Sequence, residues 1–464
     1  MREDRLSSYL RSLIVGAETP VPLAGGGCRT AINFDNAATT PPLKPVMKEI
    51  MDFAPWYASI HRGAGYKSIL SSDMFDKSRE IIKKFVKADR DKDIVIHTKN
   101  TTEAVNLLAY SLAKPGADDV VISTDMEHLA NDLPWQGKFK VDYVAIDQYG
   151  RLSLASLQEK LTKYRGRVKL VAVSGASNVT GYINPVHTIA RMAHEQGAKI
   201  FVDGAQLIPH CSFDMKNHGS AEHIDYLAFS GHKMYAPFGG GVLIGPKAAF
   251  VDCEPVYKGG GIAKLVTRNF IDWDSPPFKE EAGTPNAMAA AAMVAAIKTL
   301  DEIGLDLIHC YEQNLINYAI DRLRSIPGIE LYSCCEQNEN RVSLISFVMH
   351  GMHHKQLADI LSAEAAISVR NGLFCAHPYV VKLLKLSDDD INYYYNNPNA
   401  RFPGLVRISL GIYNNYHEID VLIALLNDIA RNKNYYKQKY SRNRQGKENS
   451  LYQEWLAASR RRLP

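Results

Sequence analysis

The segment 225–233 constrains the fold most, because an apolar run ends there abruptly in small and polar residues. After Asp225 the chain reads Tyr-Leu-Ala-Phe, which is typical of a buried strand, and then Ser-Gly-His-Lys, which places Lys233 directly after the strand. A second apolar run, 199–202, ends in the same way, at Asp203. Polar groups that follow buried strands indicate a sheet whose functional side chains gather at one edge.

Other apolar runs of strand length occur earlier in the chain, with helical patterns between them. The sequence predicts strands at 94–98, 120–123, 168–173, 199–202 and 226–229. Strands that alternate with helices indicate an open, mainly parallel α/β sheet. Beyond an alanine-rich helix that ends by Gly304, the pattern becomes helix, strand, helix, strand, which predicts a smaller α+β domain that includes a strand at 367–370.

These changes of pattern divide the chain into four segments. We expect an N-terminal helical segment packed on the body at 1–30, a large domain at 31–295, a small C-terminal domain at 296–432 and a basic extension at 433–464. A solvated or partly disordered tail is the simplest interpretation of the extension. Its arginines and lysines also suit a docking arm for an acidic partner.

Composition excludes several classes of protein. The 464 residues include 46% hydrophobic and 22% charged side chains, and the formal net charge of +4 points to no nucleic-acid partner. No apolar run approaches the roughly 20 residues of a membrane span, so we expect no membrane segment. The seven cysteines are scattered without CxxC spacing and follow no signal peptide, which predicts no metal site and a reducing, cytoplasmic location.

Lys233 and Asp203 together indicate a pyridoxal-phosphate (PLP) site. Burial lowers the pKa of a lysine and leaves a neutral amine that can form a Schiff base. Taken alone, Lys233 fits a solvated lysine on a turn equally well. An acid at the end of a neighbouring strand favours the Schiff-base interpretation, because the acid can keep the pyridine nitrogen protonated while the lysine binds the aldehyde.

The junction at 98–104 is the predicted phosphate seat. A strand ends there in a polar turn that opens a helix, so free N–H groups and the hydroxyls of Thr101 and Thr102 meet at the positive end of the helix dipole. Ordinary capping by either threonine explains the same residues. Glycine-rich nucleotide motifs are absent from this junction, which argues against NAD or ATP. His128 follows another predicted strand and suits either stacking on an aromatic cofactor or a hydrogen-bonded loop.

Seven short motifs, in order, resemble the class V aminotransferase-fold PLP enzymes. They lie at 35–40, 101–103, 126–128, 202–206, 229–233, 281–286 and 370–378. The last of them, Arg-Asn-Gly-Leu-Phe-Cys-Ala-His-Pro, is similar to the cysteine loop of the group II cysteine desulfurase/selenocysteine lyase branch. The resemblance implies PLP-dependent transferase fold type I, with a mainly parallel seven-stranded sheet in the large domain.

The resemblance also implies roles for the cofactor-binding residues. Lys233 would carry the Schiff base, Asp203 would face the pyridine nitrogen and Gln206 the phenolic oxygen. His128 would stack on the ring, and Asn178 would lie near the ring substituents. The phosphate would be held by hydroxyl and imidazole groups, one of them from the second subunit of a homodimer: Thr101, Thr102, Ser230, His232 and, from that second subunit, Thr284.

A second set of residues is expected to bind the substrate. Arg407 would hold the substrate carboxylate, because its forked donors match that group, and Arg370 would lie close by. Asn36, Ala37 and His61 complete the set. The loop around His61 also fits an ordinary surface turn.

Cys375 is the predicted nucleophile. With PLP as electron sink, its thiolate would attack the sulfur of L-cysteine, giving L-alanine and an enzyme persulfide that passes to an acceptor. Outside this loop, a small buried hydrophobe would be the usual interpretation of a free cysteine. Leu373, Phe374 and an insertion at 387–403 depart from the branch, so a C–S lyase, transaminase or epimerase acting on another amino acid is the alternative. A non-catalytic scaffold is a third interpretation, which the intact site residues disfavour.

Overall fold

A seven-stranded sheet forms the centre of the computed structural model, which describes residues 2–114, 116, 118–332 and 340–440. Only β10 runs antiparallel to its neighbours, which confirms a mainly parallel sheet. In sheet order the strands are β4 (Asp93–Thr98), β10 (Gly241–Pro246), β9 (Tyr226–Ser230), β8 (Lys199–Asp203), β7 (Val168–Ser174), β5 (Val120–Thr124) and β6 (Lys140–Val144).

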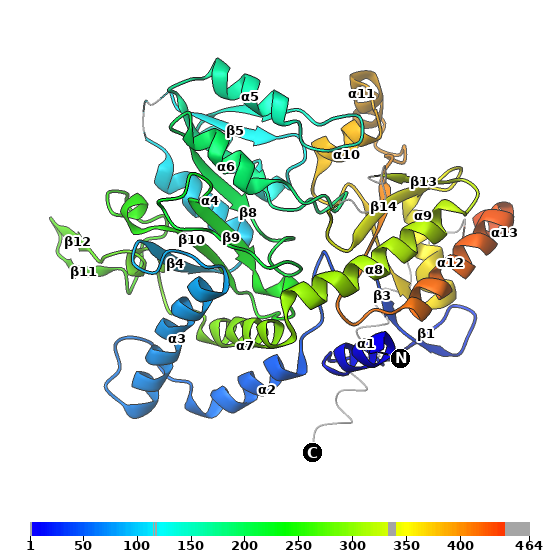
Figure 1. The fold of residues 1–464 in the computed structure, drawn as a ribbon. Helices are drawn as coiled ribbons and strands as arrows, with labels where there is room; N and C mark the ends of the chain where they lie inside the picture. Colours follow the sequence, from blue (N-terminus) through cyan, green and yellow to red (C-terminus); the bar gives the residue numbers. More distant parts are fainter. Residues whose placement is uncertain (1, 115, 117, 333–339, 441–464) are drawn as a thin grey trace.

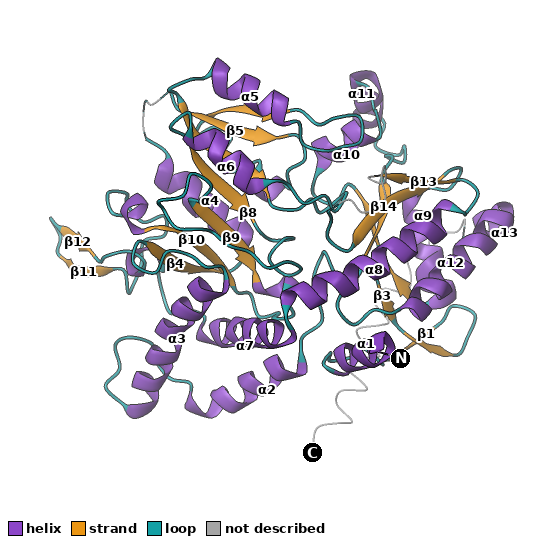
Figure 2. Cartoon of the chain, viewed as in Figure 1, coloured by secondary structure: helices purple, strands orange, loops and turns teal. Residues whose placement is uncertain are grey.

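Both faces of this sheet are buried, which explains why its strands are continuous apolar runs. Alternate residues of β8 enter different clusters: Ile200 and Val202 join one, and Phe201 joins the other. Helices cover the sheet on its two faces (Figure 2). α4 (Thr101–Leu112) packs with Phe201, whereas α5 (Leu154–Lys163), α6 (Val186–His194) and α7 (Ala287–Ile303) supply apolar side chains to the opposite cluster.

A smaller antiparallel sheet follows in the chain, as the α+β pattern predicts. Its order is β13 (Ile329–Tyr332), β14 (Leu344–Met349), β17 (Leu405–Ser409), β16 (Arg370–Gly372). Helices α8 (Leu305–Arg324), α9 (His354–Ala365) and α12 (Tyr416–Arg431) lie beside it (Figure 1). The expected continuous strand at 367–370 is wrong: β15 (Ile367–Ser368) pairs with β3 (Ile32–Asn33), and β16 changes partner to β17.

The N-terminal segment packs on this smaller unit. α1 (Arg2–Ser12) is followed by the β1 (Pro20–Pro22) and β2 (Cys28–Thr30) hairpin, and β3 then joins β15. Arg11 fixes the segment with an ion pair of 2.8 Å to Glu418. The basic extension begins as α13 (Lys433–Lys439), and its remainder, 441–464, lies outside the described residues, as do Cys334 and Cys335. The four-segment division itself stays a prediction.

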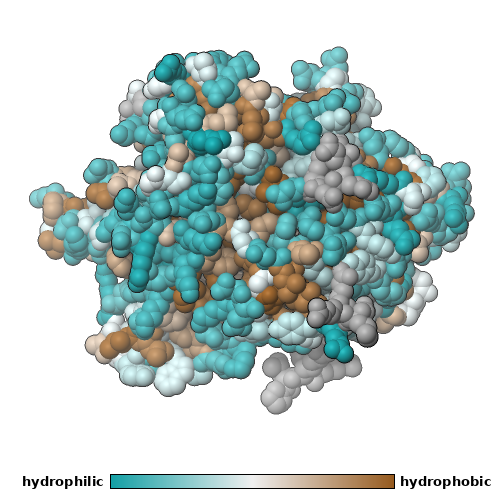
Figure 3. Space-filling view, viewed as in Figure 1, coloured by the Kyte–Doolittle hydropathy of each residue, from teal (hydrophilic) through white to brown (hydrophobic). Residues whose placement is uncertain are grey.

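The remaining elements lie around these two sheets. They are α2 (Lys44–Phe53), α3 (Tyr66–Phe85), the hairpin β11 (Ala263–Val266) and β12 (Ile271–Trp273), α10 (His377–Leu383) and α11 (Asp388–Asn396), with short 3-10 turns between them. Figure 3 shows a mostly hydrophilic face, with apolar residues at the left edge where the β11–β12 hairpin projects. Within the described ranges, no helix has the length and apolar character needed to cross a bilayer.

Candidate active site

A cavity of about 250 Å³ lies where the carboxyl ends of the central strands meet residues of the smaller sheet. Most of the predicted site residues line it. They are Ala37, Thr101, Thr102, His128, Asn178, Asp203, Gln206, Ser230, His232, Lys233, Arg370, Cys375 and Arg407. Side chains that lie as far apart as 37 and 407 in the sequence therefore share one chamber.

Lys233 ends the 3-10 turn Gly231–Lys233, directly after β9. Burial, together with the charge of Arg407, lowers the pKa of this lysine to about 8, although Asp203 and Cys375 pull in the opposite direction. An amine with this pKa is partly neutral near neutral pH. A neutral amine is what nucleophilic attack on an aldehyde requires.

Asp203 ends β8 and lies almost fully buried in the cavity wall. Its Oδ1 accepts a hydrogen bond of 2.9 Å from the N–H of Ala205, and burial raises the pKa of its carboxyl group. A cation placed against this carboxylate would offset the desolvation. Gln206, three residues on, donates from Nε2 to the carbonyl of Ala37 at 2.7 Å and so ties the β8 turn to the N-terminal loop.

The N-terminus of α4 forms a seat for an anion. The cap is Asn100, whose side chain accepts from the N–H of Glu103 at 3.0 Å, so the alternative interpretation of Thr101 or Thr102 as the cap is wrong. An asparagine caps at least as well as a threonine, and it precedes Thr101 in the chain. Thr101 instead bonds Ser230: its N–H donates to Oγ at 2.8 Å, and the two hydroxyls are 2.7 Å apart. The hydroxyls of Thr101 and Ser230 therefore converge at the positive end of the helix.

Gly241, the first residue of β10, allows the backbone at the start of α4 to pack closely against this strand. A Cβ at this position would lie 2.6 Å from the Cα of Asn100, which no side chain tolerates. The glycine run before β10 therefore serves backbone packing.

His128 faces the cavity as a neutral ring. Its Nδ1 accepts from the N–H of Ala130 at 3.0 Å, so in the neutral tautomer the proton sits on Nε2. Burial lowers its pKa to about 4, and the charges of Lys233 and Arg407 add to the effect. A neutral imidazole of fixed orientation suits stacking on a flat cofactor. The alternative of a hydrogen-bonded loop residue describes the same side chain.

The cysteine loop joins β16 to α10 in a strained conformation. Phe374 and Cys375 have φ of 51° and 54°, in the left-handed region that non-glycine residues rarely adopt. Two hydrogen bonds hold this backbone: Asn178 Nδ2 donates to the Phe374 carbonyl at 2.8 Å, and the N–H of Leu129 donates to the Cys375 carbonyl at 2.7 Å. The ring of Phe374 is buried in an apolar cluster that includes Tyr379. The loop is thus bound to the edge of the large sheet.

Arg407 lies on β17 with 2% of its surface exposed. Nη1 donates to the carbonyl of Asn178 at 2.8 Å, Nη2 donates to Asp35 Oδ1 at 3.0 Å, and the guanidinium lies 5.1 Å from the Phe374 ring centre. Burial lowers its pKa to about 10, against the attraction of Asp35. Arg370 Nη1 lies 3.7 Å from the other oxygen of Asp35. One carboxylate therefore orients both arginines.

Sequence reasoning gave Asp35 no role, although it opens the motif at 35–40. Its function depends on a bridge to Ser409 on β17, more than 370 residues later, which no local pattern encodes. The sequence marks Phe374 only as a departure from the branch and gives no signal of its packing beneath Arg407.

Three predicted residues lie outside the cavity. Asn36 is buried, and its Nδ2 donates to the Ser409 carbonyl at 2.9 Å, which makes its side chain a structural link, while its substrate contact stays a prediction. His61 pairs with Asp76 at 2.9 Å. Thr284 lines a separate hollow. Its role depends on a second subunit and stays a prediction, as does that of His61.

The sequence pattern of the aminotransferase class-V family matches residues 32–422. The chain belongs to the aminotransferase class-V family. Among its curated relatives, a probable cysteine desulfurase of Halalkalibacterium halodurans is 34% identical over 87% of this chain and 94% of its own length. A cysteine desulfurase of Haloferax volcanii is 34% identical over 81% of this chain and 88% of its own length.

Solved structures agree with this class V assignment. The apo structure of a cysteine desulfurase from Thermococcus onnurineus superposes with a TM-score of 0.76 at 30% identity, covering 86% of this chain and 95% of the other. A cysteine desulfurase of Escherichia coli superposes with a TM-score of 0.76 at 26% identity, covering 92% of this chain and 98% of the other. Class V enzymes of this kind depend on PLP, so the predicted fold and cofactor are confirmed at the level of the family.

Proposed function

We propose that this protein is a PLP-dependent cysteine desulfurase that converts L-cysteine to L-alanine and passes the sulfur through a persulfide on Cys375 to an acceptor. The observation that carries the proposal is that Cys375, Lys233 and Arg407 line one cavity. Curated relatives named cysteine desulfurase, similar over more than four fifths of the chain, support it.

The cavity fits the cofactor in three ways. Asp203 is a buried carboxylate that gains from a neighbouring cation, the Thr101–Ser230 hydroxyl pair stands at a helix N-terminus that suits a phosphate, and Lys233 has a lowered pKa. When bound, PLP would draw electrons from the substrate Cα and so ease the loss of its proton and of its sulfur.

In this proposal, Arg407 orients the substrate. Its guanidinium is held from Nη1 and Nη2 by Asn178 and Asp35, while Nε has no hydrogen-bond partner within the described residues. A guanidinium held in one orientation at the cavity wall presents a fixed positive charge to a substrate carboxylate. Arg370 supplies a second positive charge at the more exposed side of the same carboxylate-binding region.

Proton and sulfur transfer fall to Lys233 and Cys375. The neutral lysine amine accepts the Cα proton. The thiolate of Cys375 then attacks the substrate sulfur: an S–S bond forms, the substrate C–S bond breaks, and its electron pair stays with the carbon skeleton. Protonation of that skeleton releases alanine and leaves the persulfide on Cys375, which a reducing thiol or acceptor protein discharges.

We also propose that the protein acts as a cytoplasmic homodimer. The β11–β12 hairpin exposes Leu265, Val266 and Ile271 by 55%, 61% and 45%, which favours burial against a second copy. Thr284 would then complete the phosphate seat of the partner. The described cysteines are all free thiols, which agrees with a reducing compartment.

The test incubates the PLP-loaded protein with L-cysteine and a reductant and measures alanine and sulfide. We expect equal amounts of both products, and loss of both in Cys375→Ala and in Lys233→Ala. Cys28→Ala is the matched control, because Cys28 is an exposed thiol outside the cavity, and it should keep full activity. Pyruvate and sulfide that persist in Cys375→Ala would instead identify a C–S lyase and overturn the proposal.

A further inference from the structure

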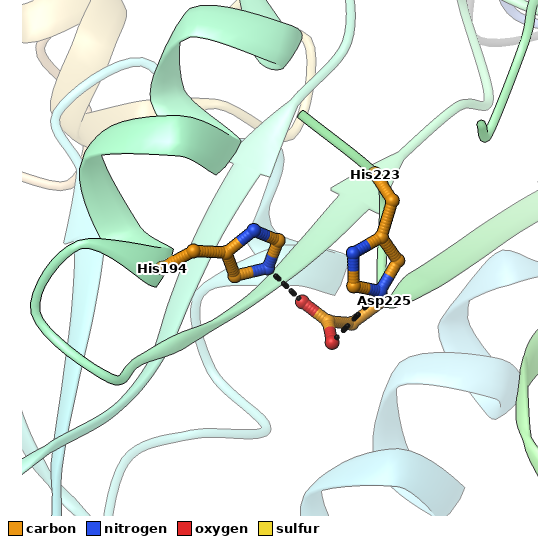
Figure 4. Close-up of side chains that lie close together, drawn as sticks. All are labelled: His194, His223 and Asp225. Atoms are coloured by element: carbon orange, nitrogen blue, oxygen red, sulfur yellow. Dashed lines mark hydrogen bonds and ion pairs between the residues drawn. The ribbon is translucent and has the colours of Figure 1, made fainter. Parts of the chain in front are cut away.

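Three histidine rings form a stack at the edge of the central sheet that is opposite the cavity. His194 and His223 are stacked with ring centres 4.7 Å apart, and His218 stacks on the other face of His223 at 4.7 Å. Asp225, which is almost fully buried, lies against His194 and His223 (Figure 4). The stack stands at the amino ends of β8 and β9, whereas the cavity lies at their carboxyl ends. One strand of five residues, roughly 16 Å, separates them.

The hydrogen bonds of both rings fix where their protons are. His194 Nδ1 lies 2.7 Å from the carbonyl of Ala221, and His223 Nδ1 lies 3.3 Å from the carbonyl of Ser220. A carbonyl oxygen only accepts, so each Nδ1 must carry a hydrogen. In the neutral rings, both Nε2 atoms are then bare lone pairs. Metal-binding histidines are oriented in this way, with Nδ1–H bonded to a backbone carbonyl.

Both bare nitrogens point at the carboxylate of Asp225, as Figure 4 shows. His194 Nε2 lies 2.7 Å from Oδ2, and His223 Nε2 lies 3.2 Å from Oδ1. At these distances, a nitrogen lone pair and the carboxylate oxygen that it faces repel each other unless a positive charge lies between them. A proton on His194 resolves one contact. At the other contact, His223 Nε2 is a buried atom without a hydrogen-bond partner in the described structure, and the oxygen that it faces, Asp225 Oδ1, is shared with the ammonium of Lys199.

We propose that His194, His223 and Asp225 form a binding site for a divalent transition-metal ion of the zinc class. The three ligand atoms all lie within 4.8 Å of one another. A tetrahedral zinc ion with bonds of about 2.0–2.1 Å holds its ligand atoms roughly 3.3 Å apart, so small movements of the two rings admit the ion. Water would take the fourth position, because the three side chains leave it open.

The surroundings of the site favour a cation. His194 ends α6, where the negative end of the helix dipole lies. The Asp225 carboxylate is held in place by the N–H of Ile200, which donates to Oδ2 at 3.0 Å. Lys199 already places an ammonium 2.8 Å from Oδ1, and because half of its side chain is exposed, it can turn to solvent when a metal ion enters. The ion would thus tie α6, the turn before β9 and the start of β8 together.

Zinc binding to the PLP-loaded protein tests the proposal. The background is Cys375→Ala, which removes the competing cavity thiol, after treatment with a chelator. We expect one zinc per chain by elemental analysis and by calorimetric titration. His223→Gln in this background should weaken the affinity by at least about tenfold. His187→Gln is the matched control, because His187 lies on the same helix and also bonds a carbonyl, that of Glu222, but stacks on Phe213.

Anomalous diffraction from zinc-soaked crystals gives an answer that does not depend on how the variants fold. We expect a peak between His194 Nε2, His223 Nε2 and the Asp225 carboxylate. Failure of the parent protein to bind zinc at micromolar concentrations, or equal binding by the parent and His223→Gln, would overturn the proposal. A peak elsewhere with none at this site would do the same.

Discussion

Replacement of Lys233 by methionine should stabilise the apoprotein, and the gain should depend on pH. The pKa of Lys233 falls from 10.5 to about 8 in the folded chain, because burial disfavours the charged amine. A difference of roughly 2.5 pH units corresponds to about 3 kcal/mol at 1.36 kcal/mol per unit. Below pH 8 both the folded and the unfolded lysine are protonated, so folding carries the full penalty there.

The penalty disappears as the pH rises. Between pH 8 and 10.5 the folded lysine loses its proton before the unfolded one, so stability increases with pH in that window. Lys233→Met is nearly isosteric and never charged. The variant should therefore exceed the parent by about 3 kcal/mol at pH 7 and by only about 1 kcal/mol at pH 10.

Urea unfolding of the two apoproteins at both pH values measures this difference. The apo form is used because cofactor binding would add its own stability. Any change in apolar packing from methionine adds a constant that cancels between the two pH values. A stability difference that stays the same from pH 7 to pH 10 would refute the inference that the lysine is held in a desolvated, charge-destabilising site.

Three further variants test other parts of the site. Arg407→Lys keeps the positive charge but loses the paired hydrogen bonds to Asn178 and Asp35. The KM for L-cysteine should therefore rise roughly tenfold, which corresponds to about 1.4 kcal/mol, and kcat should change less. Steady-state kinetics measures both constants. Phe374→Ala removes a buried ring, and urea unfolding should show a loss of about 3 kcal/mol; an unchanged midpoint would contradict the packing described. His61→Ala should leave kcat/KM within about twofold, because the side chain lies outside the cavity of its own subunit; a large loss of activity would place it in the site of a partner.

The sequence predicted the parts of the site that local order encodes. An apolar run followed by one polar residue identifies a strand end, and this placed Asp203 and Lys233 at the cavity edge. Parallel strands bring their carboxyl ends together, so two such runs sufficed to infer a shared site.

Residues whose roles depend on distant partners were beyond such reasoning. The amide of Asn36, a predicted substrate residue, is bonded to the backbone of β17 at Ser409, a contact that no local pattern predicts. The break at Val369 has the same origin, since β15 follows β3 and β16 follows β17. Both outcomes depend on which strand becomes the neighbour, and the amino-acid pattern of one segment does not contain that information.

The two backbone hydrogen bonds that hold Phe374 and Cys375 limit how sulfur can leave the protein. A thiol on a tethered loop cannot travel to a recipient, and any excursion would break the bond from Asn178, which also touches Arg407 through its carbonyl. If Cys375 carries the sulfur, as proposed, a recipient would have to bring its own nucleophile to the opening of the cavity. The width of that opening would then limit sulfur transfer, and substrate binding and sulfur transfer would compete for the same opening.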